Sequence, residues 1–394
     1  MSLRIVFILA MVSALGPFAF DTYLPAFPDI ANFLHTDIQQ IGYTVSVYLL
    51  GLAVGQLIGG PLSDYWGKAK IMLIGLGIFT FASLMTVFAN SLIFLLACRM
   101  LQAFGGGWGG VGVAGIVRDR FEGKEAAKVF SLIMLIMMMA PAIAPTLGSI
   151  ILTIAHWQGI FIFLTLYASL VMIMLWTYVF EKSTISPLKN VKLSFFKGYV
   201  SVLQNKVALC FIMVQAFAFS IMVIFLTNAS FIYQNWFAVS KFGFAGLFAC
   251  NIATMFLLNM INRLLLRWVE PIWILFFSIV LQAVAVMTLI FIVYFHNQLI
   301  FFVPGIMIAV GTIGVTAPNN QACYLQFFKE NSATAAALMG ALQLSISGIM
   351  SGFSSFIGNR TLQPIVLCMG FCAFITVFFV ILALTQVKKQ FSLP

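Results

Sequence analysis

The sequence contains few charged side chains. Of its 394 residues, 8% are Asp, Glu, Lys or Arg, whereas 62% are hydrophobic. Soluble domains carry about a quarter charged residues, so 20 basic and 10 acidic side chains cannot cover the surface of a soluble protein of this length. The scarcity of charge therefore excludes a soluble enzyme, a disordered protein and a nucleic-acid-binding protein, although the net charge is +10.

Several kinds of site are also missing. The six cysteines lie in apolar stretches, without the spacing of metal ligands or of a disulfide framework. No nucleotide-binding motif and no segment long enough for a large soluble domain occur, which disfavours a primary pump. We therefore predict no metal, no cofactor and no enzymatic activity.

Long apolar segments dominate the chain, and about 20 apolar residues suffice for a helix to cross the hydrocarbon of a bilayer. Lipid offers no partner to open sheet edges, so the expected fold class is an all-α membrane protein. Twelve transmembrane helices are expected, near residues 5–28, 38–61, 71–90, 92–116, 126–153, 157–180, 205–232, 242–267, 270–294, 299–325, 333–357 and 362–386.

The distribution of Lys and Arg supports this count. With a cytoplasmic N-terminus, most of the 20 basic residues fall on the inner side, as the positive-inside rule requires. Both termini are then cytoplasmic, and the positive charge reports topology instead of nucleic-acid binding. The polar stretch 181–204 follows the sixth span and predicts a linker between two six-helix bundles, 1–180 and 205–394.

One loop motif lies between the second and third spans. The segment GPLSDYWGKAK at 60–70 resembles the loop motif of the major facilitator superfamily. Gly60 and Gly67 are expected to allow a tight turn and close helix approach, and Lys68 to contact lipid headgroups. Asp64 and Arg118 are expected to form a gating contact on the inner side, where helix ends attract opposite charges.

A second resemblance covers much of residues 20–150. The segments DTYLPAFP at 21–28, RMLQAFGGG at 99–107 and APAIAPTLG at 140–148 are similar to the Bcr/CflA branch of drug:proton antiporters. The resemblance implies two bundles around a central cavity and proton-driven export by alternating access. Pro145 and Gly148 correspond to the antiporter motif, whose last glycine is Ser149 here, and Pro141 is a second helix-bending proline of the same segment. In this family the motif accompanies export; the alternative is a kinked helix without directional meaning.

Two charges lie within spans and are the candidates for proton coupling. An ionisable group at membrane depth is costly and indicates function, so Asp21 is expected to carry a proton, unless it is a carboxylate at the outer interface. Arg99 is expected near Asp21, with Gln102 on almost the same face; the alternative is a structural arginine bound by backbone carbonyls. Tyr23 follows Asp21 by two residues and is expected to point elsewhere on the helix.

The substrate cavity is expected to be broad and amphipathic, lined by neutral amides and aromatic rings. The candidate residues are Tyr23, Tyr48, Gln102, Trp108, Gln215, Asn228, Tyr233, Asn319 and Gln343. The glycine run around Trp108 in the fourth span is interpreted as a close-packing surface, because small residues let membrane helices approach.

These observations predict a proton-coupled secondary transporter that exports small amphipathic compounds from the cytoplasm across the inner membrane. Its partners are a small-molecule substrate, protons and the lipid bilayer, with no nucleic acid, and we expect a monomer. Three alternatives stay open: export of a specific metabolite such as a siderophore or amino acid, proton symport for uptake, and a non-transporting membrane receptor.

Overall fold

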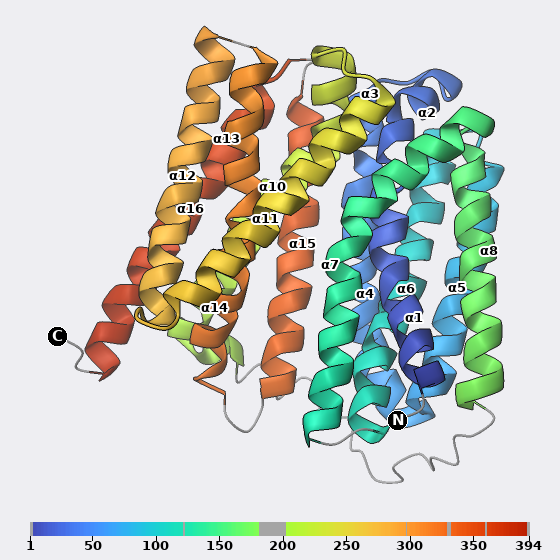
Figure 1. Ribbon diagram of the computed structural model, residues 1–394, viewed down its shortest axis with the longest axis horizontal. Helices are drawn as coiled ribbons and strands as arrows, with labels where there is room; N and C mark the ends of the chain where they lie inside the picture. Colours follow the sequence, from blue (N-terminus) through green and yellow to red (C-terminus); the bar gives the residue numbers. More distant parts are fainter. Residues whose placement is uncertain are drawn as a thin grey trace. The chain divides into compact units, whose positions relative to one another are not determined.

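A computed structural model describes residues 3–120, 123–180, 202–296, 298–328, 332–358 and 361–391. Helices dominate these residues, and the described part contains no strand (Figure 1). The order of the elements is α1(Leu3–Asp21), η1(Leu24–Ala26), α2(Phe27–Phe33), α3(Ile38–Ile41), α4(Tyr43–Trp66), α5(Lys68–Val87), α6(Leu92–Arg120), α7(Gly123–Ile154), α8(Gln158–Leu175), η2(Trp176–Phe180), α10(Lys206–Ser230), η3(Phe231–Trp236), α11(Lys241–Leu265), α12(Pro271–Phe295), α13(Leu299–Gly311), α14(Ile313–Leu325), α15(Ser332–Ile357) and α16(Gln363–Phe391).

Eleven helical segments among the described residues are long and apolar enough to cross a membrane, and the apolar stretch Met139–Ile154 of α7 is a shorter candidate. The expected all-α membrane fold is therefore confirmed, and the segments agree with twelve spans. The predicted ends of several spans differ from the observed helix ends. Most clearly, α4 runs through Pro61 to Trp66 and ends only where Gly67 adopts a φ of 93°.

The chain divides into two compact units. Unit 1 comprises residues 1–194 with 240–245, and unit 2 comprises residues 195–239 with 246–394. Most of the predicted linker 181–204 lies outside the described residues. The short segment 240–245 belongs to unit 1, in which Lys241 Nζ lies 2.6 Å from Asp29 Oδ2 of α2.

In unit 1, α6 packs against both α4 and α5. Glycine makes this approach possible, because a Cβ atom added at Gly55 would overlap the backbone carbonyl oxygen of Phe104. A Cβ added at Gly75 of α5 would lie 2.6 Å from the carbonyl oxygen of Gly105. Glycines of the second and third spans thus let their backbones approach α6 closely, as small residues do in membrane helices.

The first span is broken where the sequence places two prolines. Helix α1 ends at Asp21, and the chain continues through the short η1, with Pro25 in its first turn, into α2. A proline has no N–H group to continue the helical hydrogen bonds and fixes its own φ. The break leaves Asp21 at a helix end instead of the middle of a continuous 5–28 helix.

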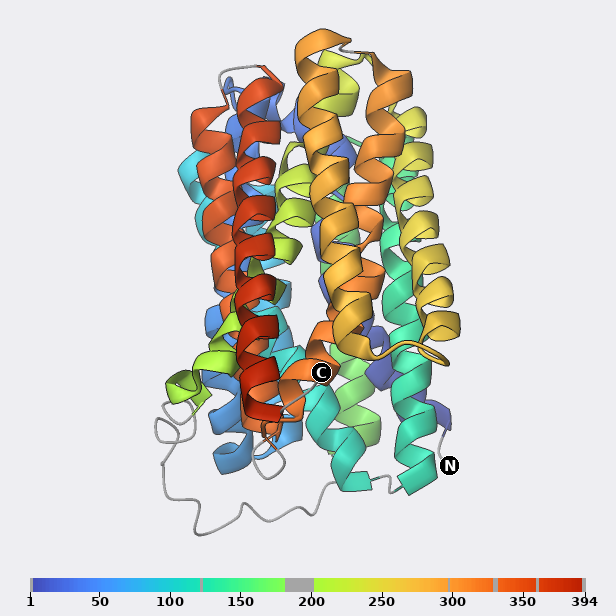
Figure 2. The ribbon, with the colours of Figure 1, turned by 90° about the vertical axis from the view of Figure 1, so that its left-hand side faces the viewer.

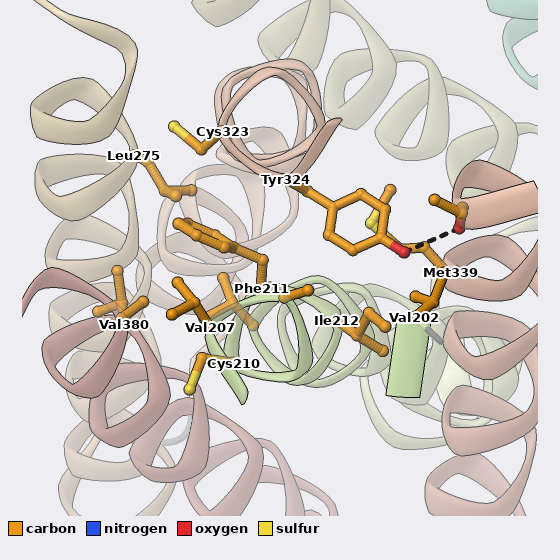
Figure 3. Packing of buried hydrophobic residues seen from close by; sticks show 14 of the residues in the cluster. Val202, Val207, Cys210, Phe211, Ile212, Leu275, Cys323, Tyr324, Met339 and Val380 are labelled. Carbon is orange, nitrogen blue, oxygen red and sulfur yellow. Dashed lines mark hydrogen bonds between the residues drawn. The ribbon is translucent and has the colours of Figure 1, made fainter. Parts of the chain in front are cut away.

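In unit 2, α10 packs against α14, α15 and α16, and α16 also lies beside α12 (Figures 1 and 2). Hydroxyl and amide groups join α10 to α15: Thr227 Oγ1 lies 3.0 Å from Ser351 Oγ, and Asn228 Nδ2 donates to Ser354 Oγ at 3.0 Å. Figure 3 shows the apolar core at one end of α10, where the Tyr324 hydroxyl donates to the Ala335 carbonyl at 2.9 Å.

Candidate functional site

The two charges predicted for coupling lie in unit 1, and both are buried. Arg99 is 0% exposed on α6, and Asp21 is 4% exposed at the end of α1. Removing charges from water is costly unless other groups compensate them. The surroundings of each side chain therefore decide what it can do.

Polar groups of α1 and α6 bind the Arg99 guanidinium, and α5 supports one of them. Its Nη2 donates to the carbonyl oxygen of Ala19 on α1 at 2.9 Å, and its Nη1 donates to Gln102 Oε1 one turn away on α6. Gln102 Nε2 in turn donates to Ser83 Oγ of α5 at 2.7 Å. This chain of hydrogen bonds fixes the plane of the guanidinium and links α1, α6 and α5.

Aromatic rings surround the same guanidinium. Arg99 Cζ lies 4.1 Å from the ring centroid of Tyr23, 4.4 Å from that of Tyr48 and 5.8 Å from that of Phe161. All three rings are fully or almost fully buried. A cation over aromatic faces within about 6 Å is stabilised electrostatically, and more strongly without water. We call Arg99, Tyr23, Tyr48 and Phe161 the arginine cage.

Tyr23 reaches the cage because of the helix break. In a continuous helix, a residue two positions after Asp21 would point to another side of the helix, and the sequence led us to expect this. In the structure, α1 has ended and Tyr23 precedes the η1 turn, so its ring turns toward α6. Its hydroxyl lies 2.8 Å from Thr44 Oγ1, which donates to the Ile41 carbonyl at 2.6 Å and so holds the ring from the α4 side.

Asp21 and Arg99 do not form an ion pair among the contacts of the described residues. Tyr48 lies beside both segments, since its ring centroid is 4.4 Å from Arg99 Cζ and 5.9 Å from the ring of Phe20, the residue before Asp21. The Tyr48 hydroxyl and Arg99 Nε are buried without a hydrogen-bond partner among the described atoms. The arrangement therefore combines a caged cation with a separate buried carboxyl group.

Helix α7 packs against the C-terminal end of α1. A Cβ atom added at Gly148 would overlap the carbonyl oxygen of Thr22, the residue that follows Asp21. Pro141 and Pro145 both lie inside α7, and Pro145 is buried. Gly148, one of the three motif residues of the fifth span, therefore contacts the chain directly after Asp21. The spacing of the motif alone did not predict this contact.

Trp108 lies in a helix interface. Its side chain is mostly buried and packs on two glycines, Gly59 of α4 and Gly75 of α5. A Cβ atom added at Gly59 would lie 2.7 Å from Trp108 Cδ1, and a Cβ atom added at Gly75 would lie 2.6 Å from Trp108 Cβ. The centroid of the Trp108 ring lies 5.2 Å from that of Phe104. These contacts assign Trp108 a packing role between three helices of unit 1.

The predicted cavity residues of unit 2 lie on α10, η3, α14 and α15. Asn228 is bound to the Ile224 carbonyl and to Ser354 on α15, whereas Asn319 donates to Asn262 Oδ1 of α11 at 2.7 Å. Tyr233 is buried, with its ring 5.8 Å from that of Phe225. Gln215 is buried on α10, and Gln343 is partly exposed on α15.

The structure of the loop motif, residues 60–70, differs from the prediction at two residues. Gly60 lies inside α4, where its carbonyl accepts from Ser63 Oγ at 2.6 Å, so only Gly67 makes the turn. Lys68 Nζ reaches the Gly115 carbonyl of α6 at 3.5 Å, so this lysine joins α5 to α6. The side chains of Asp64 and Arg118, predicted as a gating pair, lie outside the described residues.

Three contributors to the site were not predicted. Phe161 of α8 completes the cage, Ser83 of α5 supports Gln102, and the Ala19 carbonyl binds Arg99. A phenylalanine in an apolar span resembles any packing residue, and a backbone carbonyl has no sequence signal. Only Ser83, a hydroxyl on the third span, could have been suspected. The described residues hold no group of three or more His, Cys, Asp or Glu suited to a metal ion.

Comparisons with known proteins cover nearly the whole chain. The family model described as Major Facilitator Superfamily matches residues 7–352. A bicyclomycin resistance protein homolog of Haemophilus influenzae is 28% identical over 372 residues, covering 94% of this chain and 93% of that protein. Multidrug resistance protein D of Escherichia coli is 31% identical over 163 residues, which cover 41% of each chain.

The fold also matches solved structures. A POT family transporter solved in complex with 5-aminolevulinic acid superposes with a TM-score of 0.80, covering 98% of this chain and 96% of that one. The sequence identity of that pair is 13%, so this likeness concerns the fold alone.

Proposed function

Because the chain belongs to the Major Facilitator Superfamily, we propose that it is a proton-coupled exporter of small amphipathic compounds, of the multidrug efflux type. Relatives named for bicyclomycin and multidrug resistance support export of such compounds. Transport, and not chemical conversion, is the proposed activity. The protein is a multi-pass membrane protein that acts on a small molecule; the inner membrane, cytoplasmic termini and a monomeric state are parts of the proposal.

The buried carboxyl group of Asp21 is the observation that carries proton coupling. It lies at a broken helix end, almost inaccessible to solvent and without an ion pair to Arg99 among the described contacts. A buried carboxyl group without a paired cation is costly to ionise. A change in its surroundings during transport can therefore bind or release a proton, and such differential binding can shift the balance between two conformations.

The arginine cage compensates the charge of Arg99 without using the carboxylate of Asp21. Aromatic faces and the Ala19 carbonyl compensate the Arg99 charge, so the cation does not need the Asp21 carboxylate as a partner. Tyr48, which packs on Arg99, also packs against Phe20, the residue before Asp21. We assign Asp21 the role of proton carrier and Arg99 that of a fixed positive charge which tunes it.

The test is flux in proteoliposomes with an imposed pH gradient. Asp21→Asn should abolish accumulation driven by the gradient, while the variant purifies and unfolds like the wild type. Glu270→Gln is the matched control, because Glu270 is an exposed acid at the start of α12 and its loss should leave flux unchanged. Gradient-driven flux by Asp21→Asn at the wild-type rate would refute the role of Asp21. Flux in the direction of a symporter would refute export.

A further inference from the structure

An apolar groove runs along the surface of unit 2 between α10, α15 and α16. Its volume is about 410 Å³, and its lining includes Met213 and Phe217 of α10, Ile346 of α15, and Phe374 and Phe378 of α16. Phe374 is 70% exposed and Phe378 is 54% exposed. These residues lie within membrane-spanning segments, so the two phenylalanine rings form one wall of a groove suited to hydrocarbon.

A second groove lies on another side of α16 and provides a comparison. It measures about 500 Å³ and is lined mainly by α12, through residues such as Val284, Met287 and Phe291, with Val377 contributed by α16. Its lining is also almost entirely apolar. Apolar character and size therefore do not distinguish the two grooves.

A lysine distinguishes the first groove. Helix α10 begins at Lys206, and positions 206, 213 and 217 fall within about 40° of one another around a helix that turns 100° per residue. Met213 lies seven residues further on, which corresponds to about 10 Å along the axis. Lys206 is exposed, and Asn205 caps the helix by accepting from the amides of Val207 and Ala208. An ammonium group thus marks one end of the same stripe that lines the groove.

We propose that this groove binds one acyl chain of an anionic phospholipid whose phosphate contacts Lys206. The headgroup layer of a bilayer is about 5–7 Å thick on each side, which suits a phosphate near the start of α10 and an acyl chain beginning near Met213. Lysine is a compact point charge that attracts phosphate. The proposal requires only that the chain spans a membrane, and it is independent of the proposed transport activity.

The chemistry of the groove favours a phospholipid over the other candidate occupants. A hydrophobic substrate would fill the apolar part without using the charge of Lys206. A second copy of the chain would have to cover the exposed rings of Phe374 and Phe378 and would change the mass of the particle. Both occupants are outcomes of the experiment that follows.

The experiment titrates delipidated full-length protein in neutral detergent with phosphatidylglycerol or phosphatidylcholine and follows the thermal unfolding midpoint. Wild-type protein should bind phosphatidylglycerol about fivefold more tightly than zwitterionic phosphatidylcholine, the effect expected of one lysine near a headgroup of net negative charge. Lys206→Gln should abolish this preference. Phe378→Ala, at an exposed ring, should weaken binding of both lipids, whereas Val284→Ala in the second groove should leave the preference intact.

Three results would overturn the proposal. They are an unchanged preference in Lys206→Gln, unchanged affinities in Phe378→Ala, and a dimer in light scattering that Phe378→Ala converts to a monomer. Ile346→Trp provides a second route, because a bulky side chain should fill the groove and exclude the acyl chain. If its lipid-free midpoint matches the wild type and it still prefers phosphatidylglycerol, the groove is not the site.

Discussion

The arginine cage makes a quantitative prediction about Tyr23. The Tyr23 ring lies 4.1 Å from Arg99 Cζ, and both side chains are 0% exposed, so the pair is desolvated. Cation–π contacts of this kind contribute about 2 kcal/mol. The Tyr23 hydroxyl contributes one further hydrogen bond, to Thr44, and the net value of such a bond is about 1 kcal/mol.

Two substitutions separate these contributions. Tyr23→Phe keeps the ring and loses only the hydroxyl, and Thr44 still has the Ile41 carbonyl as partner, so the free energy of unfolding should fall by about 1 kcal/mol. Tyr23→Leu also loses the ring over Arg99 and the ring contact with Phe27 at 5.1 Å. The total loss should reach about 3–5 kcal/mol, as for other buried aromatic truncations.

The assay is unfolding of the purified protein by titration with sodium dodecyl sulfate in mixed micelles, followed by circular dichroism. A double-mutant cycle with Arg99→Met isolates the cation–π part, because packing lost with the ring is lost in both backgrounds. We expect a coupling free energy of about 2 kcal/mol between positions 23 and 99. A coupling below about 0.5 kcal/mol, the usual limit of additivity, would show that the rings merely pack around Arg99.

Five further substitutions, at four positions, test the helix contacts and ends by the same unfolding assay. Gly55→Ala should cost about 1–3 kcal/mol, because its Cβ would overlap the Phe104 carbonyl. Gly110→Ala has open space at an exposed helix position and should raise the free energy of unfolding by up to about 1 kcal/mol. A loss of equal size in both variants would argue against close packing of α4 on α6. Gly67→Ala should cost about 1–3 kcal/mol, since its φ of 93° with ψ of 137° suits only glycine, and a neutral result would contradict this turn. Asn205→Ala should cost about 1 kcal/mol through loss of the α10 cap, and Asn205→Asp should restore most of it.

Spans and their chemistry could be predicted from the sequence because they depend on local composition. A run of apolar residues must form a helix in lipid, since each backbone polar group needs a partner within the segment. Asp21 and Arg99 stood out for the same reason, because charge is rare and costly at membrane depth. The three-residue spacing of Arg99 and Gln102 also sufficed to place them on one face, and they are hydrogen-bonded.

The surroundings of those charges depended on residues far apart in the chain. Ala19, Tyr48 and Phe161 come from α1, α4 and α8, and no local pattern identifies a ring or carbonyl that will face a guanidinium. Because α1 ends at Asp21, Tyr23 points toward Arg99 and not to the side expected from a continuous helix. Gly148 of α7 likewise packs on the Thr22 carbonyl, a contact between segments far apart in the chain. By itself the sequence determined that this is a helical membrane protein with two unusual charges within its spans. Only the tertiary structure decided that aromatic rings and a carbonyl oxygen surround Arg99, and that Arg99 forms no ion pair with Asp21 among the described residues. The reason is that compensation of a buried charge depends on short distances between segments far apart in the chain.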